Sequence, residues 1–148
     1  MKLERDLREF IESLNARDVR YVVVGAYALA YYGRPRYTGD IDFFVQNSQQ
    51  NAARLAKIIE EFGFASLGIV EEDLTASDQV IQLGVEPNRI DLMTSISDVS
   101  FDEAWRTREY GELDGLHESA IYLKGTVKAQ QSGGGSKAGF GRSRLLVN

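Results

Sequence analysis

The sequence contains no cysteine and a single histidine, His117, and these shortages limit the metal chemistry open to the chain. Without cysteine there is neither a disulfide framework nor a thiolate zinc site. One imidazole also argues against a histidine-rich site. A metal bound to this protein would therefore be held by oxygen atoms, the ligands that magnesium, calcium and manganese prefer.

Long apolar runs are missing too. No run approaches the roughly 20 apolar residues of a membrane span, and the charged start "MKLERDLREF" lacks the apolar region of a signal peptide. The balance of 43% apolar and 26% charged residues is that of an ordinary globular domain. We therefore expect a cytoplasmic protein that makes no membrane contact.

The chain also has no excess of positive charge. The net charge of -5 argues against a broad basic surface that would bind nucleic acid. The charge is uneven, because residues 117–148 hold five basic residues and one acid, and six of the 14 glycines. We expect a domain over residues 1–116, followed by a flexible, poorly packed tail over residues 117–148.

Hydrophobic periodicity predicts alternating helices and strands. Helices are expected over residues 3–15, 26–32, 49–62 and 101–106. Strands are expected over residues 19–25, 41–45, 79–85 and 89–96. A turn at residues 86–88 should join the last two strands as a hairpin, and "REYGELDGL" is read as a strand or turn. This order predicts an α/β (α+β) fold, a mixed sheet flanked by helices.

In "TGDIDFFV", two carboxylates lie at the start of an apolar run. Asp40 and Asp42 lie on one face of the predicted strand, with Ile41 facing the core. Parallel carboxylates repel each other unless a positive charge lies between them. Asp91 repeats the pattern in "RIDLM", and three acids would converge if its strand lies beside the first. We predict a divalent-metal site, with a turn residue and an arginine ion pair as the alternative.

The stretch "VVVGAYALA" predicts a strand that runs into Gly25, with a helix beginning at once. A missing side chain lets a ligand approach the backbone, and the first N–H groups of a helix bind phosphate. Simple packing is the alternative role of this glycine. Arg36 and Thr38 are candidate triphosphate contacts, although a solvated loop explains them equally well. A surface ion pair is the expected role of Arg89.

The stretch "VGAYALAYYGRPRYTGDIDFFV" resembles the signature of the minimal nucleotidyltransferases of the DNA polymerase-β superfamily. The resemblance continues through "FGFASLGI", "QVIQLGVEPNRIDLMTSIS" and "SFDEAW", and covers about residues 5–116. It is greatest to a bacterial and archaeal branch of that superfamily. Some relatives are toxins or antitoxins of bacterial pairs, which implies a possible partner protein.

The resemblance implies a role for each matching residue. Gly25 and the backbone of Ala26 would hold the nucleotide phosphates, and Asp40 and Asp42 would bind Mg²⁺ or Mn²⁺. Asp91 would complete a second metal site and help to deprotonate the attacking hydroxyl. The enzyme would move a nucleoside monophosphate from an NTP, with ATP expected, to a hydroxyl of a protein, a tRNA or a small molecule. Pyrophosphate would be released.

Two departures from the family pattern leave an alternative open. Ala26 stands where relatives have glycine or serine, and a serine hydroxyl could bond phosphate. Relatives also end in a helix that the tail lacks, and we hypothesise a reading-frame shift near Leu116. The alternative is a catalytically weak or inactive module of the same fold that binds a nucleotide or a partner. A domain whose acids are only solvated is a third interpretation.

Overall fold

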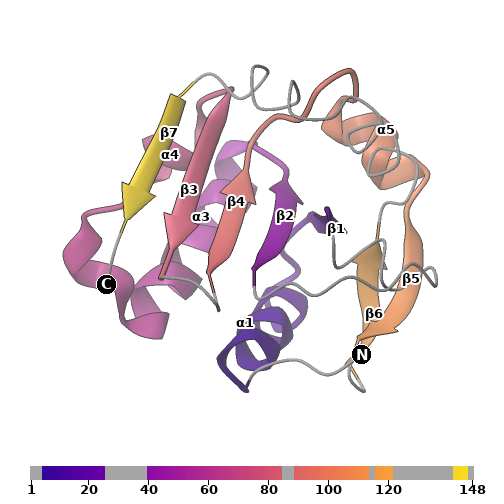
Figure 1. The fold of residues 1–148 in the computed structure, drawn as a ribbon, viewed down its shortest axis with the longest axis horizontal. Helices are drawn as coiled ribbons and strands as arrows, with labels where there is room; N and C mark the ends of the chain where they lie inside the picture. Colours follow the sequence, from indigo (N-terminus) through magenta and orange to yellow (C-terminus); the bar gives the residue numbers. More distant parts are fainter. Residues whose placement is uncertain (1–4, 26–39, 85–88, 114–115, 122–141, 147–148) are drawn as a thin grey trace.

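A computed structural model describes residues 5–25, 40–84, 89–113, 116–121 and 142–146. Its strands form one mixed sheet with helices against it (Figure 1), which confirms the predicted α/β (α+β) fold class. In spatial order the strands are β5 (Glu109–Leu113), β6 (Leu116–Ile121), β1 (Tyr21–Val24), β2 (Ile41–Val45), β4 (Ile90–Met93), β3 (Gln79–Leu83) and β7 (Arg142–Leu146). The predicted helix over residues 26–32 lies outside the described residues.

The long helices form where apolar residues recur at helical spacing. In α1 (Arg5–Ala16) the buried residues Leu7, Phe10, Ile11 and Leu14 lie on one face. The helix α3 (Gln49–Ile59) begins at Ser48, whose Oγ accepts the Asn51 N–H at 3.2 Å. Three short elements follow: η1 (Glu60–Phe64), η2 (Ala65–Leu67) and α4 (Glu71–Thr75). The predicted helix end at residue 62 is close to Gly63, whose φ of 90° interrupts the helical backbone.

The centre of the sheet has the pairing that the strand order predicts. β1 and β2 are antiparallel, β2 and β4 are parallel, and β4 and β3 are antiparallel. The antiparallel pairing of β3 and β4 agrees with the predicted hairpin, although its turn lies outside the described residues. Because β2 and β4 run in the same direction, the first residues of both strands lie at the same end of the sheet (Figure 1).

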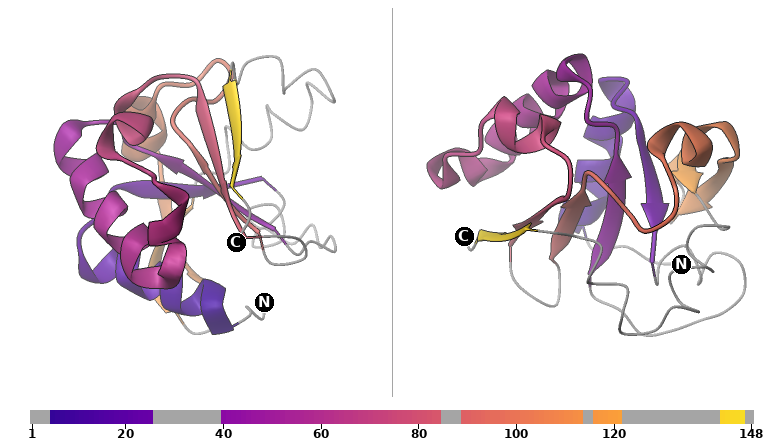
Figure 2. Two further views of the ribbon diagram at one scale, coloured as in Figure 1. Left: turned by 90° about the vertical axis from the view of Figure 1, so that its left-hand side faces the viewer. Right: turned by 90° about the horizontal axis from the view of Figure 1, so that it is seen from above.

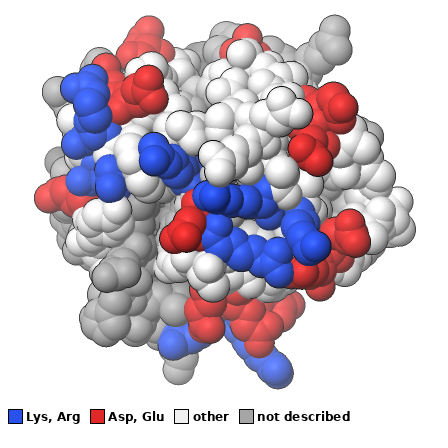
Figure 3. Space-filling model, turned by 180° about the vertical axis from the view of Figure 1, so that it is seen from behind, with Lys and Arg blue, Asp and Glu red and all other residues white. Residues whose placement is uncertain are grey.

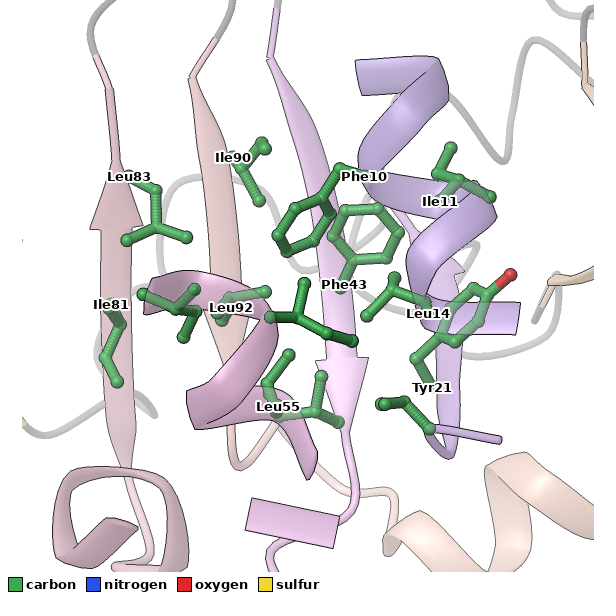
Figure 4. Packing of buried hydrophobic residues seen from close by; sticks show 14 of the residues in the cluster. Phe10, Ile11, Leu14, Tyr21, Phe43, Leu55, Ile81, Leu83, Ile90 and Leu92 are labelled. Carbon is green, nitrogen blue, oxygen red and sulfur yellow. The ribbon is translucent and has the colours of Figure 1, made fainter. Parts of the chain in front are cut away.

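Alternate residues of the central strands face two different cores. On one face, α1, α3 and α4 cover Phe43 and its neighbours (Figures 2 and 4). Phe43 packs there against Phe10 and Tyr21, with ring centroids 5.8 and 5.5 Å apart. On the other face, Phe44 packs against Phe101 of α5 (Phe101–Arg106), with centroids 5.2 Å apart. Each fully buried large side chain contributes about 1.5–3 kcal/mol.

Two strands come from residues expected in the tail. β6 pairs antiparallel with β5 and parallel with β1, and β7 pairs parallel with β3 over five residues. The sheet therefore continues beyond residue 116, the predicted boundary. Residues 122–141 lie outside the described residues, so a separate tail stays a prediction.

The helix-covered face carries basic and acidic side chains next to each other (Figure 3). Exposed ion pairs join Arg5 to Glu9 within α1, and Arg17 to Glu61 at 2.6 Å. Such exposed pairs each contribute at most about 1 kcal/mol. Within the described ranges, no helix is both long enough and apolar enough to cross a membrane.

Candidate functional site

The strand register makes two of the three predicted acids cross-strand neighbours. Asp42 of β2 lies opposite Asp91 of β4, and on its other side it lies opposite Val24, the last residue of β1. Cross-strand partners point to the same face of a sheet. Ile41 points to the other face, into the core beneath α1 and α3, as the alternation predicted. The acids therefore lie where β2 and β4 begin, while α5 lies toward the other end of these strands (Figure 1).

The environment of the Asp42 carboxyl disfavours its charged form. Burial away from water raises the pKa of its carboxyl from the ordinary 3.8 to about 8. The negative charge of Asp91, a hydrogen bond with the Asp91 side chain, and the charge of Asp40 act in the same direction. Arg89 acts against them and lowers the pKa. Without further positive charge, the site thus favours a proton on Asp42 at neutral pH.

Arg89 lies between the other two acids. Its Nε donates to Asp91 Oδ1 at 2.8 Å, and its Nη2 lies 3.2 Å from Asp91 Oδ2 and 3.3 Å from Asp40 Oδ2. Its backbone N–H donates to Asp40 Oδ1 at 3.2 Å. The Asp91 side chain is only 8% exposed and that of Arg89 23%. The expected surface ion pair of Arg89 is therefore a partly buried one that belongs to the site.

Gly25 borders Asp42 from the end of β1. Its φ of 74° lies in the left-handed region, which favours glycine. A Cβ atom at this position would come within 3.0 Å of Asp42 Oδ2 and 3.3 Å of its Cγ. The missing side chain therefore leaves the space that the Asp42 carboxylate occupies. This close approach is a stronger reason for glycine than packing between a strand and a helix.

The residues of the site suit a divalent cation in their chemistry. Asp40, Asp42 and Asp91 supply only carboxylate oxygens, the ligands of Mg²⁺ and Mn²⁺, and Arg89 offsets one of their charges. Within the described parts of the chain, no three acidic or histidine side chains already form a metal-binding group. The Arg89 guanidinium instead forms ion pairs with both Asp40 and Asp91.

Three sequence-predicted residues are not placed. Ala26, Arg36 and Thr38 lie outside the described residues, so their contacts with a nucleotide stay predictions. Arg89 belongs to the site, although its sequence position predicted only a surface ion pair. Arg89 stands two positions before Asp91, and this alternation in "RIDLM" was the signal that both side chains share a face.

These features are those of a nucleotidyltransferase fold: a mixed sheet flanked by helices, with acids on adjacent strands beside a glycine turn. A family model described as "nucleotidyl transferase of unknown function (DUF2204)" matches residues 3–110, and the chain belongs to that family. At the level of the family, the protein is a nucleotidyltransferase. The match ends before β6 and β7, which the family model does not cover.

A solved structure has a similar fold. It is that of a presumed nucleotidyltransferase from Thermotoga maritima, which is similar to this chain with a TM-score of 0.57 and 18% sequence identity. The alignment covers 86% of this chain and 82% of the other. No curated protein sequence matches the chain. At this identity the likeness concerns the fold alone.

Proposed function

We propose that the protein is a metal-dependent nucleotidyltransferase of the DNA polymerase-β superfamily, which moves a nucleoside monophosphate from an NTP to a hydroxyl acceptor. The observation that carries the proposal is the register of Asp42 and Asp91, with Asp40 and Gly25 beside them. Membership in a nucleotidyl transferase family supports the reaction class. ATP is the proposed donor.

In this mechanism the carboxylates of Asp40, Asp42 and Asp91 would hold Mg²⁺ or Mn²⁺. Bound there, the cation would neutralise charge on the attacking and leaving oxygens of an in-line displacement. Asp91 accepts the proton of the attacking hydroxyl, which then bonds to the α-phosphorus as pyrophosphate leaves. The backbone at Gly25, against which the Asp42 carboxylate lies, is proposed to hold the phosphates together with the backbone of Ala26. Ala26, Arg36 and Thr38 are proposed to contact the triphosphate.

The acceptor is proposed to be a hydroxyl of a protein, a tRNA or a small molecule. A partner protein, as in toxin–antitoxin pairs, is part of this proposal and rests on the sequence resemblance. We further propose that the protein acts in the cytoplasm without membrane contact.

Two features favour a second candidate. Arg89 forms ion pairs with Asp40 and Asp91, and Ala26 stands where the family has a second glycine or a serine. A module that binds a nucleotide or a partner without turnover would be compatible with both features.

A transfer assay separates the two candidates. The protein is incubated with Mg²⁺ or Mn²⁺, each NTP labelled at the α-phosphate, and an RNA or protein fraction of a cell extract. The enzyme should label an acceptor and release pyrophosphate, and Asp42→Asn should abolish both. Asp78→Asn is the matched control, because Asp78 is exposed and has a φ of 58° that asparagine tolerates. Nucleotide binding without label transfer or pyrophosphate release would support the module.

A further inference from the structure

We propose that Arg89 is a resident counter-ion that competes with the divalent cation for Asp40 and Asp91, and so sets the metal affinity of the site. The inference rests on the proposed function, because it concerns the same acids. It adds a role that neither the family description nor the fold assigns: a side chain that must release the acids before the site can be loaded.

The first argument is the number of carboxylate oxygens that Arg89 occupies. Its backbone N–H and Nη2 contact the two oxygens of Asp40 at 3.2 and 3.3 Å. Its Nε and Nη2 contact the two oxygens of Asp91 at 2.8 and 3.2 Å. All four oxygens therefore have a partner on one residue. A cation shared by these acids has to compete with the guanidinium for three of these oxygens, although each oxygen keeps a second lone pair.

The second argument is charge. Three carboxylates and one guanidinium leave the cluster with two negative charges when all are ionised, and the guanidinium repels any cation that enters. The Asp91 side chain is 8% exposed, while those of Asp40 and Arg89 are each 23% exposed. Partly buried charges are screened less than surface charges, so salt and solvent weaken this repulsion less than they would at the surface.

The third argument is that Arg89 can leave without unfolding its surroundings. It lies directly before β4, and its carbonyl oxygen accepts the Ile41 N–H at 3.1 Å, which ties its backbone to β2. The guanidinium stands at the end of a long side chain with several rotatable bonds. The side chain can therefore swing away from Asp91 while the strand pairing that positions the acids stays in place.

Calorimetric titration with Mn²⁺ alone tests the proposal on the full chain. Four proteins are compared: the wild type, Arg89→Gln, Arg17→Gln and Asp42→Asn. Arg17→Gln is the matched control, because it removes an arginine ion pair to Glu61 outside the site. Arg89→Gln should lower the Kd for Mn²⁺ about tenfold, Arg17→Gln should leave it within about twofold, and Asp42→Asn should abolish binding.

The outcomes distinguish this inference from the proposed function. If the wild type binds Mn²⁺ and Arg89→Gln binds it equally or more weakly, Arg89 supports the acids and the counter-ion role is rejected, while the enzyme proposal stands. If neither protein binds Mn²⁺, the metal site fails, and both the proposed function and this inference fail with it.

A second measurement applies to the wild type and does not depend on the folding of a variant. The Nε–Hε signals of arginine are followed by NMR while Mg²⁺ is added. The Arg89 signal should shift as its bond to Asp91 breaks, and the Arg17 signal should stay in place. An Arg89 signal that does not move at saturating Mg²⁺ would overturn the proposal.

Discussion

Gly25 and Asp42 constrain each other across the edge of β1 and β2. The backbone of Gly25 has a φ of 74°, and its missing Cβ leaves the space in which the Asp42 carboxylate lies. A side chain at this position meets two costs: the left-handed backbone, and overlap with Asp42. The two costs can be measured separately.

Gly25→Ala should reduce the free energy of unfolding by about 1–2 kcal/mol more than Gly68→Ala does. Gly68 is the matched control, because its φ of 67° imposes a similar backbone cost while a Cβ there would meet nothing within 4 Å. Urea unfolding of both variants measures the difference. Gly25→Ala should also weaken Mn²⁺ binding, because Asp42 has to move. Equal losses of stability in the two variants would contradict the close approach at Gly25.

The raised pKa of Asp42 predicts how stability depends on pH. In a chelating buffer, the native state holds a proton on Asp42 up to about pH 8, whereas the unfolded state loses it near the ordinary 3.8. The native state therefore binds more protons between these values, and its free energy of unfolding falls as pH rises from about 4 to about 8. Asp91, Asp40 and Arg89 are the charged groups that act on this carboxyl.

Asp42→Asn should remove this part of the pH dependence. We expect the variant to equal the wild type near pH 4 and to exceed its stability by a few kcal/mol, on the order of the shift, at pH 8. Chemical unfolding at a series of pH values, with EDTA present, measures it. A constant difference between the two proteins across this range would show that the Asp42 pKa is not raised in the native state.

Among the elements, β1, β2 and α3 are joined by one buried side chain. Asn51 is 3% exposed, and its Oδ1 accepts the Arg20 N–H at 2.7 Å. Its Nδ2 donates to the carbonyls of Arg20 at 3.1 Å and Gln46 at 2.8 Å. Arg20 lies directly before β1 and Gln46 directly after β2. Gln46 N–H also donates to the Arg20 carbonyl at 3.2 Å, so the amide adds three hydrogen bonds where the pairing of the two strands ends.

Asn51→Ala should lower the free energy of unfolding by about 2–4 kcal/mol, because it removes three partly buried hydrogen bonds to the backbone of Arg20 and Gln46. Asn47→Ala is the control, since its Nδ2 makes one hydrogen bond, to the Thr75 carbonyl at 3.2 Å. It should cost about 0.5–1.5 kcal/mol. Urea unfolding at one pH compares the two, and a similar loss in both would refute the bridging role of Asn51.

Several elements of the fold could be predicted from local pattern. β2 has the predicted bounds, and α5 forms over the predicted residues, because their apolar periodicity is clear within a few residues. α4, β6 and β7 were not predicted. "RSRLL" and "LHESAI" carry weak strand patterns, and each pairs with a strand far away in the chain. Such pairing depends on tertiary context more than on local propensity.

For the molecule as a whole, metal binding should appear as added stability. A ligand that binds only the native state raises the free energy of unfolding with its concentration. With Mn²⁺ at 100 times its Kd, we expect the Tm of the wild type to rise by about 5–10 °C. Asp42→Asn should show no rise, and Asp78→Asn should behave as the wild type. Differential scanning calorimetry measures the three, and equal shifts in all of them would place the cation elsewhere.

The amino-acid sequence by itself determined the fold class and the enzyme class at the level of the family, and it predicted which acids form the candidate site. Alternation within a strand is a local property, so Asp40 and Asp42 could be assigned to one face, and Ile41 to the core, without knowing their neighbours. The glycine at the end of the first strand is likewise a local signal.

Only the tertiary structure decided which charged side chains lie next to each other. The parallel register of β2 and β4 places Asp42 opposite Asp91. It also places Arg89 between Asp91 and Asp40, although Asp40 lies 49 positions before Arg89 in the sequence. Register between distant strands follows from the packing of both sheet faces at once, which no short stretch encodes. The burial that raises the pKa of Asp42 is also collective, because every element around the carboxyl helps to exclude water.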